Sequence, residues 1–115
     1  MCIAIYKPQG VKIPWQALEN AEYNNDDGWG FAVARDGKLI VRRGVSGFSA
    51  FRSAFDPFEH EQAIIHFRIR THGAVKEAMC HPFMVSSNLA LIHNGMIDIA
   101  CNVSEKKSDT WHFNE

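Results

Sequence analysis

The sequence predicts an α+β fold in which helices and antiparallel strands form separate layers. Strand-like segments follow one another with only two helical segments among them, whereas a parallel sheet needs a helix after nearly every strand. Asp36-Gly37 joins two of the strand-like segments and is the strongest short hairpin signal in the chain. No phosphate loop is evident, because Gly28-Trp29-Gly30 precedes a strand and is not followed by a lysine with Ser or Thr. A doubly wound nucleotide-binding fold is therefore disfavoured.

The first half of the chain predicts a strand, a helix and a hairpin in that order. Residues 2–6 are rich in β-branched and aromatic residues, which favour a strand. Residues 14–23 carry apolar side chains at helical spacing, and Pro14 suits the first turn of a helix. The hairpin is predicted over residues 29–34 and 38–43, on either side of its turn.

The second half predicts a short helix followed by two buried strands. Ser49 is expected to cap a helix over residues 49–55, and Pro57 then interrupts it. Residues 62–70 and 88–92 are apolar segments that run into polar loops, as buried strands do. These segments complete the layered α+β arrangement.

Composition limits the classes of function. The 115 residues suit one domain or part of one, with 46% hydrophobic and 22% charged residues. A net charge of -1 sets up no broad positive field, so nucleic acid is not an expected partner. The apolar runs are far shorter than the roughly 20 residues of a membrane span, and no secretory signal is evident. No membrane association and a cytoplasmic location are expected.

Cysteines and histidines give no metal or disulfide pattern. Cys2, Cys80 and Cys101 are an odd number without close pairing, so at least one thiol should stay free. Buried or incidental thiols are the simplest interpretation of the last two. Four of the six histidines are candidate metal ligands but form no compact ligand motif: His66, His72, His81 and His93. Neither a metal nor a cofactor is predicted.

Cys2 is the first candidate for chemistry, because it directly follows the initiator Met1. Removal of Met1 would leave a thiol and an α-amine on one residue. The α-amine has a reference pKa of about 7.7 to 8.0, so part of it is neutral near pH 7 and can accept the thiol proton. Position alone favours the simpler interpretation, a small buried strand residue.

Six short stretches carry a family pattern: residues 1–5, 27–31, 66–73, 81–83, 93–95 and 108–110. They occur in the order seen in class II glutamine amidotransferases, and the chain resembles compact members of that family. The resemblance implies an N-terminal-nucleophile hydrolase fold, a sandwich of two antiparallel sheets flanked by helices. It also implies hydrolysis of glutamine to glutamate and ammonia.

The resemblance also implies roles for individual residues. Cys2 would be the nucleophile that forms a γ-glutamyl thioester, with its freed amine as base and then acid. Asn94 and Gly95 would donate hydrogen bonds to the oxygen of the attacked carbonyl. Arg68 would clamp the substrate α-carboxylate through its planar donor fork, and Asp109 would accept the α-ammonium.

Further residues are expected around the substrate. Thr71, His72 and Gly73 would form the wall near Arg68, with the Thr71 hydroxyl as an additional carboxylate contact. Trp29 and Phe31 could line the pocket, although large aromatic residues on a strand usually belong to the core.

Simpler interpretations compete with several of these roles. Arg68 could be a surface charge on an exposed strand face, since arginine is mostly exposed. Asn94-Gly95 also favours a type I′ turn, which is compatible with the proposed oxyanion role. Asp109 could cap a helix.

The chain is shorter than the family domains that it resembles. Residues 108–110 resemble a helix start five residues before the last residue. Residues 1–115 are therefore interpreted as an incomplete glutaminase domain, truncated at the C-terminus. An incomplete sheet leaves edges and apolar surface, so self-association is an additional expectation.

The functional hypothesis is glutamine hydrolysis, with the ammonia passed to a separate synthase as partner. Two alternatives stay open. One is a catalytically silent relative that senses glutamine or binds a partner. The other is an amidohydrolase that acts on another γ-glutamyl or related amide.

Overall fold

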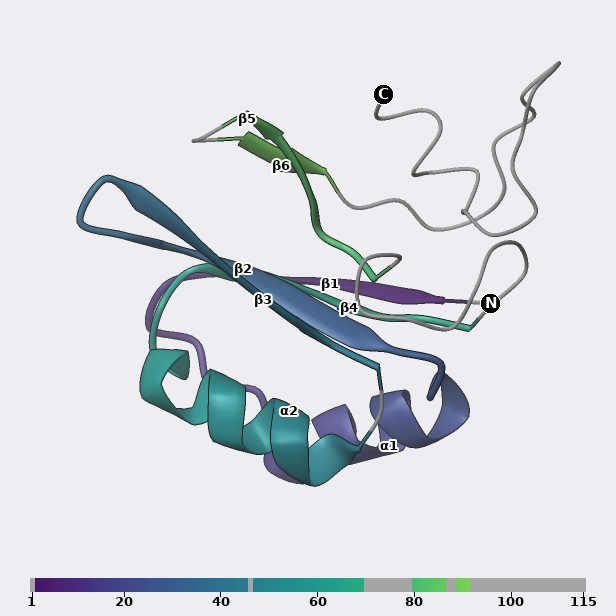
Figure 1. Cartoon of the computed structure of the whole chain (residues 1–115). Helices are drawn as coiled ribbons and strands as arrows, with labels where there is room; N and C mark the ends of the chain where they lie inside the picture. The colour runs from purple at the N-terminus through teal and green to yellow at the C-terminus, as the bar shows by residue number, and fades with distance from the viewer. Residues whose placement is uncertain (1, 46, 70–79, 87–88, 92–115) are drawn as a thin grey trace, which may run out of the picture.

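A computed structural model describes residues 2–45, 47–69, 80–86 and 89–91 (Figure 1). In chain order the elements are β1 (Ile3–Lys7), α1 (Trp15–Asn24), β2 (Trp29–Arg35), β3 (Lys38–Gly44), α2 (Phe48–Phe55), the 3-10 turn η1 (Asp56–Phe58), β4 (Ala63–Phe67), β5 (Phe83–Ser86) and β6 (Leu89–Leu91). The predicted α+β class is confirmed.

Four strands form one antiparallel sheet in the order β1-β4-β2-β3. Phe67 on β4 lies opposite Ile3 on one side and Trp29 on the other, so β4 is a central strand. Both helices cover one face of this sheet, and the short β5–β6 pair lies on the opposite side (Figure 1). The sheet thus has a helix-covered face and a second face that points toward β5.

The predicted hairpin is confirmed. Asp36 and Gly37 have φ angles of 53° and 72°, the positive values that a two-residue type I′ turn requires. The turn fixes a register in which Arg35 pairs with Lys38 and Trp29 pairs with Gly44. Each strand extends one residue beyond its predicted end.

The helix-covered face is packed by aromatic side chains. Phe31, Phe51 and Phe67 are 0% exposed, and Phe55 is 1% exposed. The Phe51 ring centroid lies 5.0 Å from that of Phe67 and 5.6 Å from that of Trp29. Each fully buried aromatic side chain of this kind contributes about 1.5–3 kcal/mol by leaving water. Trp29 and Phe31 are therefore core residues, as large aromatic residues on a strand usually are.

Two local predictions were wrong, and one strand was not predicted. Ser49 does not cap α2, because the helix begins at Phe48 and its N-cap position is Gly47, with φ of 90° and no side-chain cap. Glycine permits this positive φ, which lets the chain turn into the helix one residue early. Strand β5 had no sequence prediction. Strand β4 ends at Phe67, earlier than the predicted end at residue 70.

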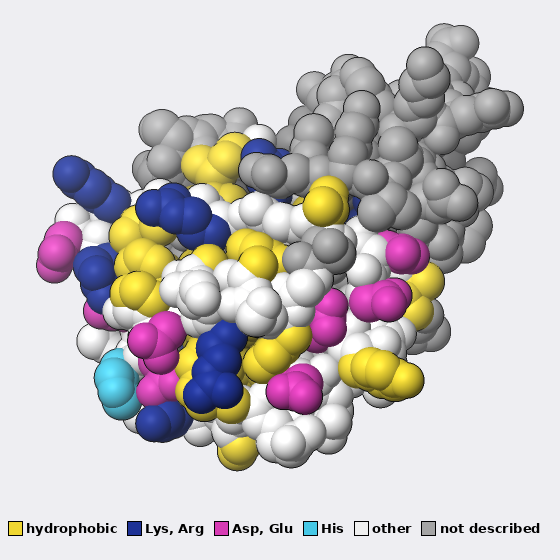
Figure 2. All heavy atoms as spheres, turned by 60° about the horizontal axis from the view of Figure 1, so that its bottom comes forward, with side chains coloured by type: hydrophobic (Ala, Val, Ile, Leu, Met, Phe, Trp, Pro, Cys, Tyr) yellow, Lys and Arg dark blue, Asp and Glu magenta, His cyan; other side chains and the backbone are white. Residues whose placement is uncertain are grey.

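The molecular surface on the helix side mixes both signs of charge with apolar side chains (Figure 2). Exposed Tyr23 and Tyr6, 80% and 61% accessible, are among the apolar contributors to the whole surface. In the described ranges, no helix is long and apolar enough to cross a membrane.

Candidate active site

The second face of the sheet carries the polar side chains that the strands do not use for the core. Side chains alternate along a strand, so His66 and Arg68 point away from the helices when Phe67 points toward them. The register places Ala4 and Gly30 on either side of His66, and Arg43 next to Gly30. We call this surface the second face.

Cys2 lies at one end of the second face, directly before β1. Ile3 pairs with Phe67, and Cys2 and Arg68 directly adjoin this last pair of the ladder, each on its own chain segment. The Ile69 backbone N–H donates a hydrogen bond to Cys2 Sγ at 3.2 Å, and the thiol lies 3.4 Å from the Ile69 carbonyl oxygen. Cys2 is half-buried and its thiol is held against the end of β4.

Arg68 is buried, with 4% of its surface exposed. Its backbone N–H donates to the Gly28 carbonyl at 2.7 Å, and its carbonyl accepts from the Asp27 N–H at 2.8 Å. These two bonds continue the β2–β4 ladder beyond Phe67 and fix the residue at the sheet end. The interpretation of Arg68 as a surface charge is therefore wrong.

Residues 80–82, which we call the crossing segment, pass across the second face before β5. A Cβ on Gly30 would overlap the His81 carbonyl oxygen, and one on Gly28 would overlap Cys80 Sγ. Gly28 also has a φ of 144°, which few other residues adopt. The Cys80 thiol lies 3.4 Å from the Gly44 carbonyl oxygen and is fully buried. Glycine directly before β2 and glycine on β2 thus allow the thiol and the backbone carbonyl, respectively, to approach the sheet closely.

A pair of histidines joins the crossing segment to β4. His81 Nδ1 lies 2.9 Å from His66 Nε2, and the ring centroids are 4.1 Å apart at an interplanar angle of 72°. His66 is 0% exposed and His81 is 6% exposed. In the sequence, both are scattered histidines without a compact ligand motif, although each also lies in one of the six family stretches. Strand alternation would have placed His66 on the second face, but nothing local in the sequence indicates that His81 meets it.

Comparison with known proteins shows the family. The chain is 31% identical over 113 residues, 96% of its length, to glutamine–fructose-6-phosphate aminotransferase (isomerizing) of Shewanella oneidensis. The same enzyme of Pseudomonas putida is 35% identical over 86 residues, 72% of the chain, and that of Corynebacterium diphtheriae is 31% identical over 102 residues, 85% of the chain. The chain belongs to the class II glutamine amidotransferases.

This member of the amidotransferase family spans only 19%, 14% and 16% of the lengths of those three relatives. No protein-family model matches it. The identity therefore concerns a small part of each relative.

Of the site residues predicted for this amidotransferase family member, the structure brings Cys2 and Arg68 to one end of one face. The others lie outside the described residues: Thr71, His72, Gly73, Asn94, Gly95 and Asp109. Within the described ranges, no three His, Cys, Asp or Glu side chains form a group that could hold a metal ion.

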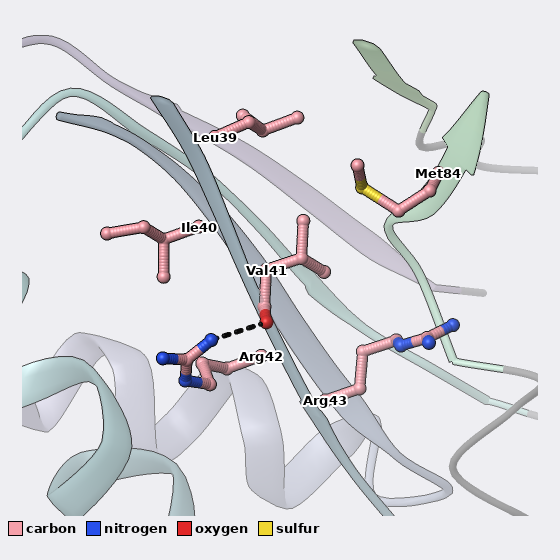
Figure 3. A pocket seen from close by; sticks show the side chains of 6 residues that line it. All are labelled: Leu39, Ile40, Val41, Arg42, Arg43 and Met84. Atoms are coloured by element: carbon pink, nitrogen blue, oxygen red, sulfur yellow. Dashed lines mark hydrogen bonds between the residues drawn. The ribbon is translucent and has the colours of Figure 1, made fainter. Parts of the chain in front are cut away.

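A hollow of about 520 Å³ lies on the sheet away from the candidate site (Figure 3). Arg43 and Val41 of β3 extend toward Met84 of β5, whereas Arg42 points elsewhere and donates to the Val41 carbonyl at 3.0 Å. The lining residues are Leu39, Ile40, Val41, Arg42, Arg43 and Met84. Neither Cys2 nor Arg68 contributes to it, so this hollow is not where the nucleophile lies.

Proposed function

We propose that the chain hydrolyses the side-chain amide of glutamine, with Cys2 as nucleophile and Arg68 as the clamp on the substrate α-carboxylate. The observation that carries this proposal is that both residues reach the same end of the second face. Glutamine carries a carboxylate at one end and an amide at the other. A guanidinium fork beside a thiol can therefore hold one end while the thiol attacks the other.

The chemistry starts once Met1 is removed. The free α-amine of Cys2 takes the thiol proton, and the sulfur forms a bond to the side-chain amide carbon of glutamine. The protonated amine then gives its proton to the leaving nitrogen, and ammonia departs from a γ-glutamyl thioester. Water attacks the thioester carbon, the C–S bond breaks, and glutamate leaves with the thiol restored.

The remaining site residues are assigned by the same proposal. Asn94 and Gly95 donate to the oxygen that becomes negative, and loss of one such donor costs about a hundredfold to a thousandfold in rate. Asp109 accepts the substrate α-ammonium. Thr71 contacts the carboxylate and forms the wall near Arg68 together with His72 and Gly73.

Residues 1–115 are proposed to act as one glutaminase-type unit within an N-terminal-nucleophile sandwich. The relatives are named for an aminotransferase reaction of glutamine with fructose 6-phosphate. For the present chain we assign only the glutamine half. The ammonia is proposed to pass to an acceptor site on a separate synthase.

Intact mass spectrometry with the glutamine-like electrophile 6-diazo-5-oxo-norleucine tests the proposal. We expect the purified chain to lack Met1 and to gain one adduct, which peptide mapping assigns to Cys2. Cys2→Ala should take no adduct, and Cys101→Ser is the matched control that should react like the wild type. Free glutamine should compete and slow the reaction. A glutamine analogue that keeps the side-chain amide but lacks the α-carboxylate should not.

Two outcomes would reject the assignment. Retained Met1 or an unmodified Cys2 would favour a catalytically silent module that binds glutamine or a partner. Adduct formation without competition by glutamine, followed by turnover of a different amide in a substrate panel, would favour another amidohydrolase.

A further inference from the structure

We propose that the His66–His81 pair is a positioning contact that holds the crossing segment on the second face, and that the contact is lost when both rings are protonated. The effect of this contact on the substrate site rests on the proposed function. Its effect on the crossing segment does not depend on that function.

The histidine pair lies where the crossing segment meets the second face. His66 lies on the central strand β4, on the same face as Arg68, which follows two residues later, just beyond the end of the strand. His81 belongs to the crossing segment, and its carbonyl oxygen lies against Gly30. The ring contact therefore ties the segment to the strand that carries Arg68.

The contact depends on how many protons the two rings hold. His81 Nδ1 and His66 Nε2 face each other at 2.9 Å, so one nitrogen must donate and the other must accept. Neutral or singly protonated rings satisfy this requirement. Two protonated rings would direct two N–H donors at each other and bury two positive charges side by side.

Among the described residues, the charged neighbours of the pair on the second face are cations. Arg43 and Arg68 share this face with His66, together with the thiols of Cys2 and Cys80 and the Tyr6 hydroxyl. The described strands place no carboxylate on this face. In the unfolded chain, both imidazoles take up protons below about pH 6.5. The unfolded state then binds more protons than the paired state, so the contact weakens as pH falls below that value.

Cys80 is a built-in reporter of the crossing segment. Its side chain is fully buried, with the thiol packed toward Gly28 and 3.4 Å from the Gly44 carbonyl oxygen. A small alkylating reagent can reach this thiol only when the segment leaves the sheet. Its reactivity reports the His66–His81 contact without any reference to glutamine.

The experiment measures alkylation of Cys80 by iodoacetamide with peptide mapping, at pH 7.5 and pH 5.5, each normalised to the unfolded chain at the same pH. In the wild type we expect normalised labelling to rise about tenfold at the lower pH, the loss of roughly one hydrogen bond of ordinary strength. The key variant combines His66→Gln with His81→Asn. Its amides can bond at the same ring-nitrogen positions but do not titrate, so its labelling should stay low at both pH values.

Either of two results would overturn the proposal: wild-type labelling that does not change with pH, or a double variant that follows the wild type. If the double variant fails to fold, His81→Leu tests the contact at pH 7.5, where it should already show the high labelling.

A second readout connects the pair to the site. With the diazo glutamine analogue, His81→Leu should raise the concentration needed for half-maximal adduct formation at Cys2 about tenfold, while the maximal rate changes little. The double amide variant should restore the wild-type value, and an unchanged half-saturation in His81→Leu would refute the positioning role. A wild-type chain with no Cys2 adduct would instead reject the proposed function, and Cys80 labelling would still decide whether the histidine contact holds the segment.

Discussion

Arg68 is a residue at which lysine is not an equivalent substitution. Its guanidinium is buried at the sheet end, where its planar fork can form two parallel bonds to a carboxylate. Arg68→Lys keeps the charge but loses this geometry, and we expect kcat/KM for glutamine to fall about ten- to hundredfold, mainly through KM. Steady-state measurement of ammonia release tests this prediction. Arg52→Lys, a change on the exposed side of α2, is the control, and an equal effect of both variants would contradict the role of Arg68.

Glu22 is a residue whose charge weakens the fold. Burial, with a further contribution from Asp26, raises its pKa above 4.5, although the Gly47 N–H opposes the shift. The folded state therefore binds the proton more tightly than the unfolded state, and stability is lost as pH rises through the folded pKa. Glu22→Gln should raise the Tm at pH 7 by a few degrees, because the amide removes the charge.

The pH dependence distinguishes this explanation from a general effect of substitution. The gain from Glu22→Gln should shrink as the pH falls toward 4.5, since the wild-type carboxyl is then protonated. Thermal unfolding followed by circular dichroism at both pH values measures the difference. Glu19→Gln, at an exposed position on the same helix and the last contributor to the raised pKa of Glu22, should raise the Tm less than Glu22→Gln does. A gain that does not depend on pH would refute the electrostatic cause.

At the scale of elements, strand β2 and the crossing segment fit together through a missing side chain. Gly30→Ala places a Cβ where the His81 carbonyl oxygen lies, so the segment must shift. Overpacking of this kind costs about 1–3 kcal/mol, and Cys80 should become open to alkylation. Gly10→Ala is the control: its new Cβ meets nothing within 4 Å, and its φ of 80° adds only local strain. Equal Cys80 labelling in the two variants would show that the close approach does not hold the segment.

Elements encoded by local chemistry were predictable from the sequence. The Asp36-Gly37 turn supplies two positive φ angles, so the hairpin and its register follow from two residues. The start of α2 was misplaced because serine was assumed to cap it, whereas the turn at Gly47 begins the helix without a side-chain cap. Strand β5 was missed because its pairing with β6 and its place across the sheet depend on the crossing segment.

At the scale of the whole molecule, motif order in the sequence predicts which residues form the site, but not how distant segments are placed around it. Motif order implied Cys2 and Arg68, and the register of two distant strands brings them to one end. The sequence contains no indication of the contact between His66 and His81, which lie 15 residues apart. That contact depends on how closely the crossing segment approaches Gly30, a property of the assembled sheet.

The sheet separates stability from chemistry, with an aromatic core on one face and the candidate site on the other. Phe51 contacts Phe31, Phe55 and Phe67, whose ring centroids lie 6.0, 5.5 and 5.0 Å from its own. Phe51→Leu removes these ring contacts and leaves unfilled volume, so we expect a loss of about 1–3 kcal/mol and a Tm lower by roughly 5 °C or more. A small domain with about 5–15 kcal/mol of total stability survives this change when cold.

The second face should not respond to that loss below the unfolding transition. At 15 °C, about where such domains are most stable, Phe51→Leu should leave Cys80 labelling and Cys2 adduct formation within about twofold of the wild type. Arg68→Lys should slow adduct formation at Cys2 much more than Phe51→Leu does. If Phe51→Leu impairs Cys2 as strongly as Arg68→Lys does, the two faces are coupled through β4. In that case the buried aromatic layer would itself position the nucleophile, because Phe67 lies between His66 and Arg68 in the sequence.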